Sequence, residues 1–234
     1  MSGALQLEEV ACAGRLHPLS LRIQSGERIC LLGRSGAGKS TLLRLANGSL
    51  RPDQGHVSWN GTPLNRLSRR QRCEIGTLWQ GLLLVEELNV AQNINAGALG
   101  RHSLLWALRN LVGALNHEAC CEVMHQVGLE TDLLFCSVAA LSGGQRQRVA
   151  LARLLRQNAS IVLADEPLSA LDPALSELVL DRLLHQSSCL VSLHRPDLAH
   201  RFDRVIGLRD GSLVMDEPAL KLGAHDLSWL YRRD

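Results

Sequence analysis

The chain carries the run Gly33-Arg34-Ser35-Gly36-Ala37-Gly38-Lys39-Ser40-Thr41, which matches the pattern G-x-x-x-x-G-K-[ST] at every fixed position. The apolar segment 28–32 before it predicts a short buried strand, and Lys39–Ala46 predicts a helix that Asn47-Gly48 ends. The order strand, glycine loop, helix turns backbone N–H groups and a helix N-terminus towards one point. This order predicts a loop that binds phosphate.

Two side chains of this loop have predicted roles. In a loop of this kind Lys39 reaches the β- and γ-phosphates of a nucleotide, and the Ser40 hydroxyl ligates Mg²⁺. Glycine and serine also crowd ordinary turns between strands and helices. The complete motif in this setting favours phosphate binding over an ordinary turn.

A second motif, Ile161-Val162-Leu163-Ala164-Asp165-Glu166, ends in two acids. An apolar run of this length predicts a parallel strand buried on both faces. The carboxyl ends of such strands are where open α/β sheets place their ligands. Asp165 is therefore placed to hold Mg²⁺ through water, and Glu166 to polarise the attacking water as general base. Taken alone, the two acids fit a solvated loop with a helix cap equally well.

A third motif, Leu141-Ser142-Gly143-Gly144-Gln145, precedes the second. Ser142 followed by Gln145 is a capping box, which predicts a helix that continues to about Arg156. A helix N-terminus with glycines is also an anion site. The local structural interpretation and the functional one are therefore compatible.

Six motifs together carry a family resemblance, and the chain resembles the ATP-binding cassette (ABC) ATPases over nearly its whole length. In the order of that family they are the phosphate loop, Gln80 at a strand end, Leu141–Gln145, Asp165-Glu166, Ser169-Ala170-Leu171-Asp172 and His194. The resemblance implies an α/β fold: a P-loop NTPase (RecA-like) nucleotide-binding domain with an antiparallel β subdomain and an inserted α-helical subdomain. It implies ATP and Mg²⁺ as cofactors.

The resemblance also assigns the remaining site residues. Glu166, His194, Lys39 and Gln80 form the catalytic set; His194 contacts the γ-phosphate and helps to position the water, and Gln80 ligates Mg²⁺ with Ser40 and Asp165. By themselves, a glutamine after a strand is usually a surface amide and a histidine there is a hydrogen-bonded residue at a strand end. Asp172 before Pro173 is a good helix N-cap, and in the family this loop crosses a dimer interface.

The partners follow from the same resemblance. In the family the signature Ser142, Gly143, Gly144 and Gln145 caps the ATP held by the phosphate loop of a second cassette, which implies a homodimer. Membrane permease subunits, and a periplasmic or surface solute-binding protein acting through them, are the further expected partners. We therefore expect the chain to lie peripherally on the cytoplasmic face of the bacterial inner (cell) membrane.

Composition agrees with one cassette. The chain has 234 residues, 46% hydrophobic content and a net charge of +2, so no nucleic-acid partner is expected. A basic cluster is interpreted as a solvated helix face: Arg66, Arg69, Arg70 and Arg72. No apolar stretch approaches the roughly 20 residues that span a bilayer, and no signal peptide is expected. The scattered cysteines lack C-x-x-C spacing, which favours reduced, buried thiols over a disulfide or metal framework.

Periodicity divides the chain. Residues 1–84 are expected to form nucleotide core with an antiparallel layer, 85–140 a helical subdomain, 141–216 nucleotide core and 217–234 a C-terminal tail. Turns are expected at Ser25-Gly26, Asp53-Gln54-Gly55, Asn60-Gly61 and Asp210-Gly211. The helix over 116–127 is expected to bury Ala119, Val123 and Val127.

Two stretches leave alternatives open. The apolar residues Leu82, Leu83, Leu84, Val85 and Leu88 fit a partner surface or a buried segment equally well. Residues 1–58 contain no Phe, Trp or Tyr to stack on adenine; Arg15 could stack on the base, or the base contact is loose.

Two segments narrow the resemblance to the ATPase subunit of bacterial phosphonate importers. They are Asn93–Ser103 with Trp106-Ala107-Leu108, and Val191–Ala199 with Arg204–Leu208. Gly81-Leu82 departs from that pattern, in which a glutamine and an aromatic follow Gln80. Import of a phosphonate is the expectation; phosphate, phosphite or another small solute, or a soluble ABC ATPase without transport, are the alternatives.

Overall fold

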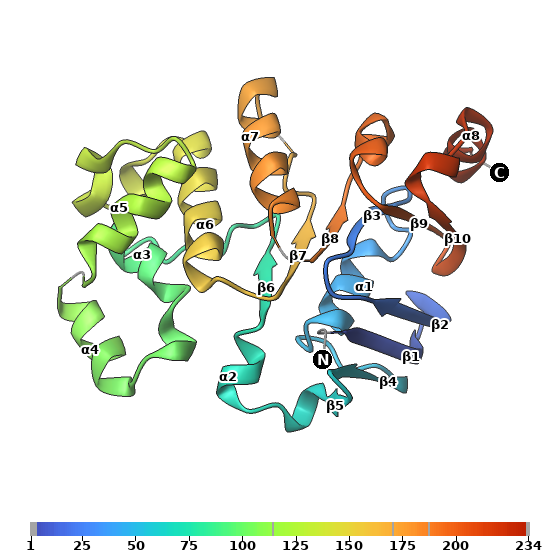
Figure 1. Ribbon diagram of the computed structural model, residues 1–234, viewed down its shortest axis with the longest axis horizontal. Helices are drawn as coiled ribbons and strands as arrows, with labels where there is room; N and C mark the ends of the chain where they lie inside the picture. Colours follow the sequence, from blue (N-terminus) through green and yellow to red (C-terminus); the bar gives the residue numbers. More distant parts are fainter. Residues whose placement is uncertain (1–3, 114, 170, 187, 233–234) are drawn as a thin grey trace.

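The computed structural model describes residues 4–113, 115–169, 171–186 and 188–232. The chain folds into two sheets and a lobe of helices (Figure 1). The expected subdomain limits reach residues 1–3 and 233–234, and the motif 169–172 includes Ala170. Those positions lie outside the described residues.

The larger sheet has six strands in the order β10-β9-β3-β8-β7-β6. Neighbouring strands from β9 to β6 are parallel, and β10 pairs antiparallel with β9. Its strands are β3 (Arg28–Leu32), β6 (Ile75–Leu78), β7 (Ile161–Asp165), β8 (Cys189–Ser192), β9 (Arg204–Arg209) and β10 (Ser212–Pro218).

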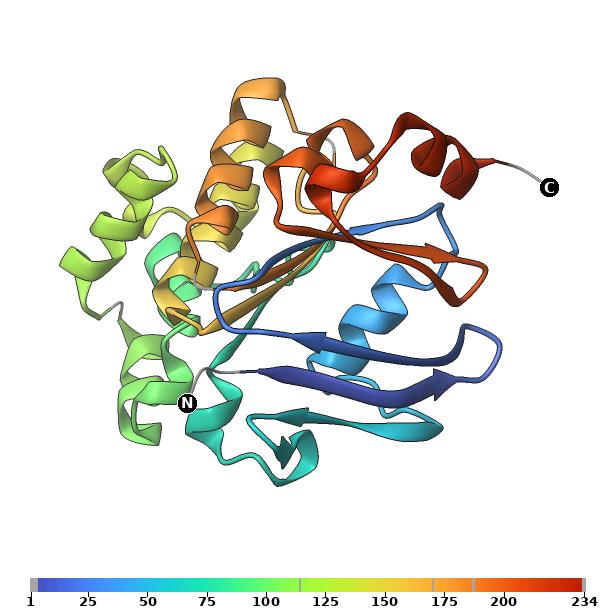
Figure 2. The ribbon, with the colours of Figure 1, turned by 45° about the vertical axis from the view of Figure 1, so that its right-hand side comes forward.

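The smaller sheet is antiparallel, with the order β2-β1-β4-β5. Its strands are β1 (Leu5–Cys12), β2 (Leu16–Ile23), β4 (Gln54–Trp59) and β5 (Thr62–Pro63). Helix α1 (Lys39–Ala46) lies between the two sheets, as Figure 2 shows. Its leucines share one buried cluster with Leu7 of β1 and Leu163 of β7.

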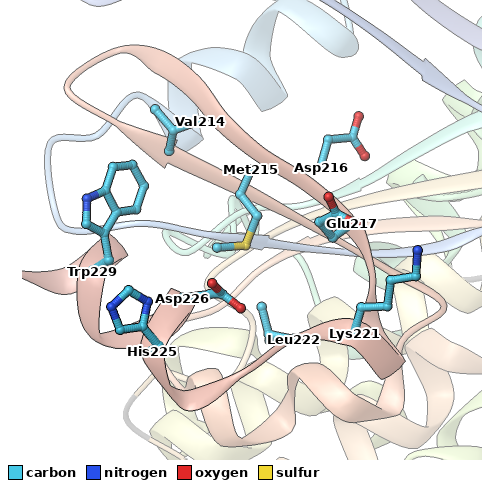
Figure 3. Close-up of a pocket in the computed structure, with 9 residues that line it drawn as sticks. All are labelled: Val214, Met215, Asp216, Glu217, Lys221, Leu222, His225, Asp226 and Trp229. Atoms are coloured by element: carbon cyan, nitrogen blue, oxygen red, sulfur yellow. The ribbon is translucent and has the colours of Figure 1, made fainter.

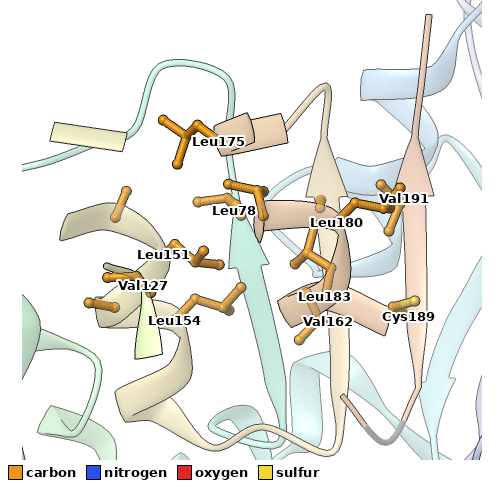
Figure 4. Packing of buried hydrophobic residues seen from close by; sticks show 14 of the residues in the cluster. Leu78, Val127, Leu151, Leu154, Val162, Leu175, Leu180, Leu183, Cys189 and Val191 are labelled. Carbon is orange, nitrogen blue, oxygen red and sulfur yellow. The ribbon is translucent and has the colours of Figure 1, made fainter. Parts of the chain in front are cut away.

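The larger sheet is buried on both faces. Along β7, Ile161 and Leu163 face α1, whereas Val162 and Ala164 face a second core on the opposite side. Helices α6 (Gly143–Gln157) and α7 (Pro173–Leu184) cover that second side, where their leucines meet Val162 (Figure 4). Because both faces are covered, the central strands read as continuous apolar runs rather than alternating ones.

The helical lobe extends the second core. It contains α3 (Val90–Ala96), α4 (Leu104–Val112) and α5 (His117–Gln126), and α6 packs against α3 and α5. The expected α/β nucleotide-binding fold, with its antiparallel layer and inserted helices, is thereby confirmed.

The remaining elements are short. They are α2 (Arg69–Arg72), α8 (Ala224–Tyr231) and the 3₁₀ turns η1 (Leu64–Arg66), η2 (Leu99–Arg101), η3 (Thr131–Phe135), η4 (Val138–Ala140), η5 (Pro196–Arg201) and η6 (Ala219–Lys221). The basic cluster is exposed, as expected, although Arg66 lies on η1 and not on the helix with the others. None of the helices in the described ranges has both the length and the apolar content to span a bilayer.

The expected turn at Asp53-Gln54-Gly55 was wrong, because Gln54 and Gly55 begin β4. Gly55 has φ +74°, and a Cβ there would lie 2.2 Å from the Glu8 carbonyl oxygen and 2.3 Å from that of Glu9. The β1–β4 register shifts at this point. Glycine is therefore required by a β-bulge inside the sheet. The turn expected at Asp210-Gly211 is confirmed, since both residues have positive φ between β9 and β10.

The stripe expected on the helix over 116–127 was partly wrong. Val123 and Val127 are buried, but Ala119 is only half-buried, and Cys120 and Met124 fill the contact with the core. The segment after Gln80 is buried in part. Its members alternate: Leu82 and Leu84 pack against the core, whereas Leu83 and Val85 are exposed.

The expected burial of the cysteines holds for three of them, whereas Cys12, Cys73, Cys121 and Cys136 are only partly buried. All seven are free thiols, and Cys30, Cys120 and Cys189 are buried. In the described ranges no group of His, Cys, Asp or Glu side chains forms a metal cluster.

Candidate functional site

The candidate site lies where four parallel strands end side by side. The order β3-β8-β7-β6 places their carboxyl ends at one edge of the larger sheet. The phosphate loop follows β3, His194 follows β8, Asp165-Glu166 closes β7 and Gln80 follows β6. The topology therefore gathers motifs that lie far apart in sequence.

The phosphate loop depends on glycine at two positions. A Cβ on Gly33 (φ +151°) would lie 2.4 Å from the Leu208 carbonyl oxygen of β9. Gly38, with φ +102°, is the N-cap of α1. A bond of 3.2 Å from the Gly211 amide to the Ala37 carbonyl ties the loop to the β9–β10 turn. Left-handed backbone and close approach explain why larger residues are excluded.

Lys39 lies inside this loop. Its side chain is 4% exposed, and Nζ donates to the carbonyls of Gly33 at 2.7 Å and Arg34 at 3.1 Å. The Glu166 Oε1 lies 3.9 Å from Nζ. Burial lowers the pKa of Lys39, and the carboxylates of Glu166 and Asp165 oppose that effect. A buried ammonium surrounded mainly by neutral carbonyls is suited to an anionic ligand.

A buried serine joins the two acids, and the sequence motifs did not reveal it. Ser192 of β8 is fully buried; its Oγ donates to Asp165 Oδ1 at 2.9 Å and accepts from the Glu166 amide at 2.9 Å. Glu166 has φ +50°, an uncommon conformation for a residue other than glycine. The only sequence signal was a hydroxyl in the otherwise apolar segment 189–193. Ser192 therefore holds the Asp165 carboxylate and the backbone at Glu166.

Glu166 also meets His194. His194 Nε2 lies 2.5 Å from Glu166 Oε1, and the two side chains are 41% and 16% exposed. They line a small pocket of ≈ 130 Å³ together with Ser169. Ser169 Oγ donates to the Glu166 carbonyl at 2.9 Å. The surface of the pocket is mostly apolar, and its volume is large enough for a water molecule.

The structure brings the three expected Mg²⁺ ligands to the same edge without joining them. Ser40 is half-buried at the start of α1, and Gln80 is exposed one residue beyond Trp79. Within the described residues no hydrogen bond links Gln80 to Ser40 or Asp165. Asp165 is 6% exposed, and no described group donates to its Oδ2. Carboxylate, hydroxyl and amide oxygens at one edge of the sheet are the kind of ligands that Mg²⁺ prefers.

The signature residues lie apart from the phosphate loop. The capping box is present: the Gln145 amide donates to Ser142 Oγ at 3.3 Å, and the Ser142 amide donates to Gln145 Oε1 at 2.9 Å. Helix α6 packs beside β6, three strand spacings from β3, which is roughly 14 Å. Within the described ranges no hydrogen bond or ion pair joins residues 142–145 to the phosphate loop. The chain does not complete its own site with them.

Asp172 lies near the signature residues 142–145. Its Oδ1 accepts from the Leu175 amide at 3.0 Å, which makes it the N-cap of α7. A Cβ on Gly144 would meet the Leu175 side chain at 3.7 Å. The two elements that the family resemblance places at a dimer interface are therefore neighbours.

A cleft of ≈ 500 Å³ borders the phosphate loop at Gly36. Arg15 and His17, from the β1–β2 hairpin, help to line it. His17 is an aromatic side chain within residues 1–58, which contain no Phe, Trp or Tyr. Another cavity, of ≈ 590 Å³, lies between β10 and α8 and is lined by none of the motif residues (Figure 3).

Comparison with known proteins shows the family of the chain. The family model described as ABC transporter matches residues 16–169. "Phosphonates import ATP-binding protein PhnC" of Anaeromyxobacter dehalogenans is 46% identical over 92% of this chain, which spans only 45% of that relative. The protein of the same name from Treponema denticola is 37% identical, covering 86% of this chain and 82% of its own length.

Solved structures agree. The chain superposes on "Dimeric Structure of MJ0796, a Bacterial ABC Transporter Cassette" with a TM-score of 0.78 and 27% identity, covering 92% of this chain and 98% of that one. The same cassette in a post-hydrolysis state bound to ADP and Pi gives a TM-score of 0.77 at 28% identity, with the same coverage.

Proposed function

Because the chain belongs to the ABC transporter family of ATP-binding proteins, we propose that it is the ATP-hydrolysing subunit of an importer for a small oxyanion, most specifically a phosphonate. The observation that carries the ATPase part of this proposal is the group formed by Lys39, Asp165, Glu166 and His194 at one edge of the sheet. Lys39 supplies charge for the phosphates, and Glu166 is the proton acceptor for an attacking water.

The chain's own residues divide the chemistry between them. The loop 33–41 binds the phosphates through its amides, and Lys39 leaves its carbonyl partners for the β- and γ-phosphate oxygens. Glu166 takes the proton of the water that attacks the γ-phosphorus, and His194 positions that water with it. Arg15 or His17 is placed to stack on the base in the adjoining cleft.

Magnesium fits the oxygen groups at this edge. Ser40, Gln80 and Asp165 would hold it, with Asp165 acting through water. When bound, Mg²⁺ would supply positive charge that offsets the negative charge developing on the phosphate oxygens.

The active unit is a dimer of two such chains. The signature at residues 142–145 lies away from its own phosphate loop, so it has no ligand within one chain. The similar cassette structures are described as dimeric. In the pair, the signature of each chain and its neighbour Asp172 cap the ATP of the other.

The importer role rests on the curated relatives, whose names specify phosphonate import. We assign membrane permease subunits as the partners of the dimer, a solute-binding protein as the donor of cargo to the permease, and the cytoplasmic membrane face as the location.

The variant Glu166→Gln tests the ATPase. We expect turnover to fall about 10²- to 10⁴-fold, because the amide cannot accept the proton, and we expect ATP to hold the variant as a dimer. Glu118→Gln, on the exposed face of α5, is the matched control and should keep parental turnover. Undiminished turnover of Glu166→Gln would contradict the proposed chemistry.

Cargo requires a separate assay. The chain is combined with its permease and solute-binding protein, and ATP turnover is measured with a phosphonate, phosphite or phosphate. Stimulation by the phosphonate supports the specific proposal, whereas stimulation only by phosphate or phosphite reassigns the cargo. A chain that co-purifies with no permease would point to a soluble ABC ATPase.

A further inference from the structure

The segment after Gln80 is held in an unfavourable conformation. Leu82 and Leu83 have φ values of +55° and +50°, which side chains other than glycine rarely adopt. Leu83 is also 63% exposed, so burial does not compensate it. Two successive residues of this kind persist only where neighbouring groups fix the backbone.

Arg153 of α6 is one such group. Its Nη2 donates to the Leu82 carbonyl and its Nη1 to the Leu83 carbonyl, both at 2.5 Å. The guanidinium is partly buried, and burial lowers its pKa. Among the described residues no carboxylate pairs with it. The partly buried guanidinium charge of Arg153 therefore interacts with two neutral carbonyl groups of one loop.

Asn93 of α3 is the second group. Its side chain is fully buried; Oδ1 accepts from the Val85 amide at 2.9 Å, and Nδ2 donates to the Val85 carbonyl at 3.0 Å. Helices α3 and α6 are themselves in close contact, because a Cβ on Gly97 would lie 2.0 Å from the Arg153 carbonyl oxygen. Residues 82–85 are therefore fastened to the helical lobe from two sides.

Gln80 belongs to the nucleotide core around α1, not to the helical lobe. It follows β6, and the preceding Trp79 packs against the core around α1, with the Arg44 guanidinium 6.0 Å from its ring. Gly81 lies between this core and the residues fastened to the helical lobe, and a Cβ there would have no atom within 4 Å. The path from the nucleotide edge to α6 thus runs through Gly81 and the pair of carbonyls that Arg153 holds.

We propose that Arg153 is a positioning residue that fastens the loop after Gln80 to the signature helix. This inference rests on the proposed function, because it links the chain's own ATP site to the signature that caps the partner's ATP. The fork of the guanidinium matches two successive carbonyls, which the single ammonium of lysine cannot hold in the same way. Without Arg153 the strained loop relaxes. A displacement of Gln80 is then no longer transmitted to α6.

The test uses the full chain in the Glu166→Gln background, where ATP-bound dimers accumulate. Arg153→Met removes the charge and both donors while filling most of the same volume. We expect its ATP-dependent dimer dissociation constant to rise at least about tenfold, since two charge-assisted hydrogen bonds are lost, while the monomer binds MgADP with parental affinity. Arg153→Lys should fall between Arg153→Met and the parent.

Arg148→Met is the matched control on the same helix. Arg148 donates to the Gly128 carbonyl, away from the loop, so its loss should leave dimerisation within twofold of the parent. Dimerisation of Arg153→Met within twofold of the parent overturns the inference. An equal loss of MgADP affinity and dimerisation also overturns it, because the role would then be general stability.

The proposed function fails in a distinguishable way. A parent Glu166→Gln chain that does not dimerise with ATP contradicts the dimeric ATPase itself, whatever the Arg153 variants do. If Arg153→Met does not fold, Arg153→Lys decides: parental dimerisation overturns the inference, and weakened dimerisation with parental MgADP affinity supports it.

Discussion

Replacing Ser192 with alanine should damage both stability and catalysis. The hydroxyl is fully buried and makes two hydrogen bonds, one from the Glu166 amide and one to Asp165 Oδ1, each 2.9 Å long. Alanine leaves the buried amide without an acceptor and removes a donor from a carboxylate that is itself 6% exposed. Glu166 would then keep its positive φ without the bond that holds its amide.

The magnitude follows from the two bonds. An unsatisfied buried N–H costs about 1–3 kcal/mol, and a hydrogen bond to a charged group contributes about 1.5–3 kcal/mol. We expect Ser192→Ala to lose about 2.5–6 kcal/mol of unfolding free energy, or roughly 5–24 °C in Tm for a chain of this size. Since small misplacements of reacting groups cost up to about 10²-fold, we expect kcat to fall about 10- to 100-fold.

Ser188 supplies the matched control. It is also buried, lies at the opposite end of β8 and makes one side-chain bond, accepting from the Gly26 amide at 2.9 Å. Ser188→Ala should lose about 1–3 kcal/mol and keep parental kcat. Both variants are compared by urea unfolding and by phosphate release at a temperature where each is folded. Parental kcat in folded Ser192→Ala, or an equal loss of kcat in Ser188→Ala, would refute the reasoning.

Two further predictions concern buried titratable groups. Because burial lowers the pKa of Lys39 below its ordinary 10.5, the unfolded chain binds that proton more tightly, and stability rises as pH passes through the folded pKa towards 10.5. The unfolding free energy of Lys39→Met relative to that of the parent, measured by urea unfolding, should therefore decline as the pH rises through that range. A difference in unfolding free energy that stays constant with pH would contradict the lowered pKa of Lys39. Burial also raises the pKa of Cys189 to about 12 and of Cys120 to about 11. At pH 8 a thiol reagent should therefore modify these two cysteines and the buried Cys30 only after unfolding. Labelling of the three at the same rate as the other cysteines would contradict their burial.

Local signals located the elements well. The strand Arg28–Leu32 and the helix Lys39–Ala46 have the expected limits, and Ser142 caps the signature helix as its spacing predicts. These features depend on neighbouring residues: an apolar run, a glycine N-cap, and a hydroxyl three residues before an amide. Interactions of that range are visible in the chain alone.

The misses share a different cause. Gly55 belongs to a typical turn sequence, but its positive φ is required by the bulge opposite it on β1. Cys120 rather than Ala119 faces the core because α3 and α6 fix the rotation of α5. Ser192 and Arg153 carried no motif, since their partners lie on other elements. Sequence spacing cannot report contacts of this kind.

By itself the sequence determined the chemistry: a lysine in a glycine loop, two acids after a buried strand, and a signature whose glycines open a helix. The tertiary structure decided which of these groups meet. Parallel strands in the order β3-β8-β7-β6 bring Lys39, His194 and Glu166 to one edge, because hydrogen-bonded parallel neighbours end side by side. The same order leaves the signature beyond β6, separated from the phosphate loop of its own chain.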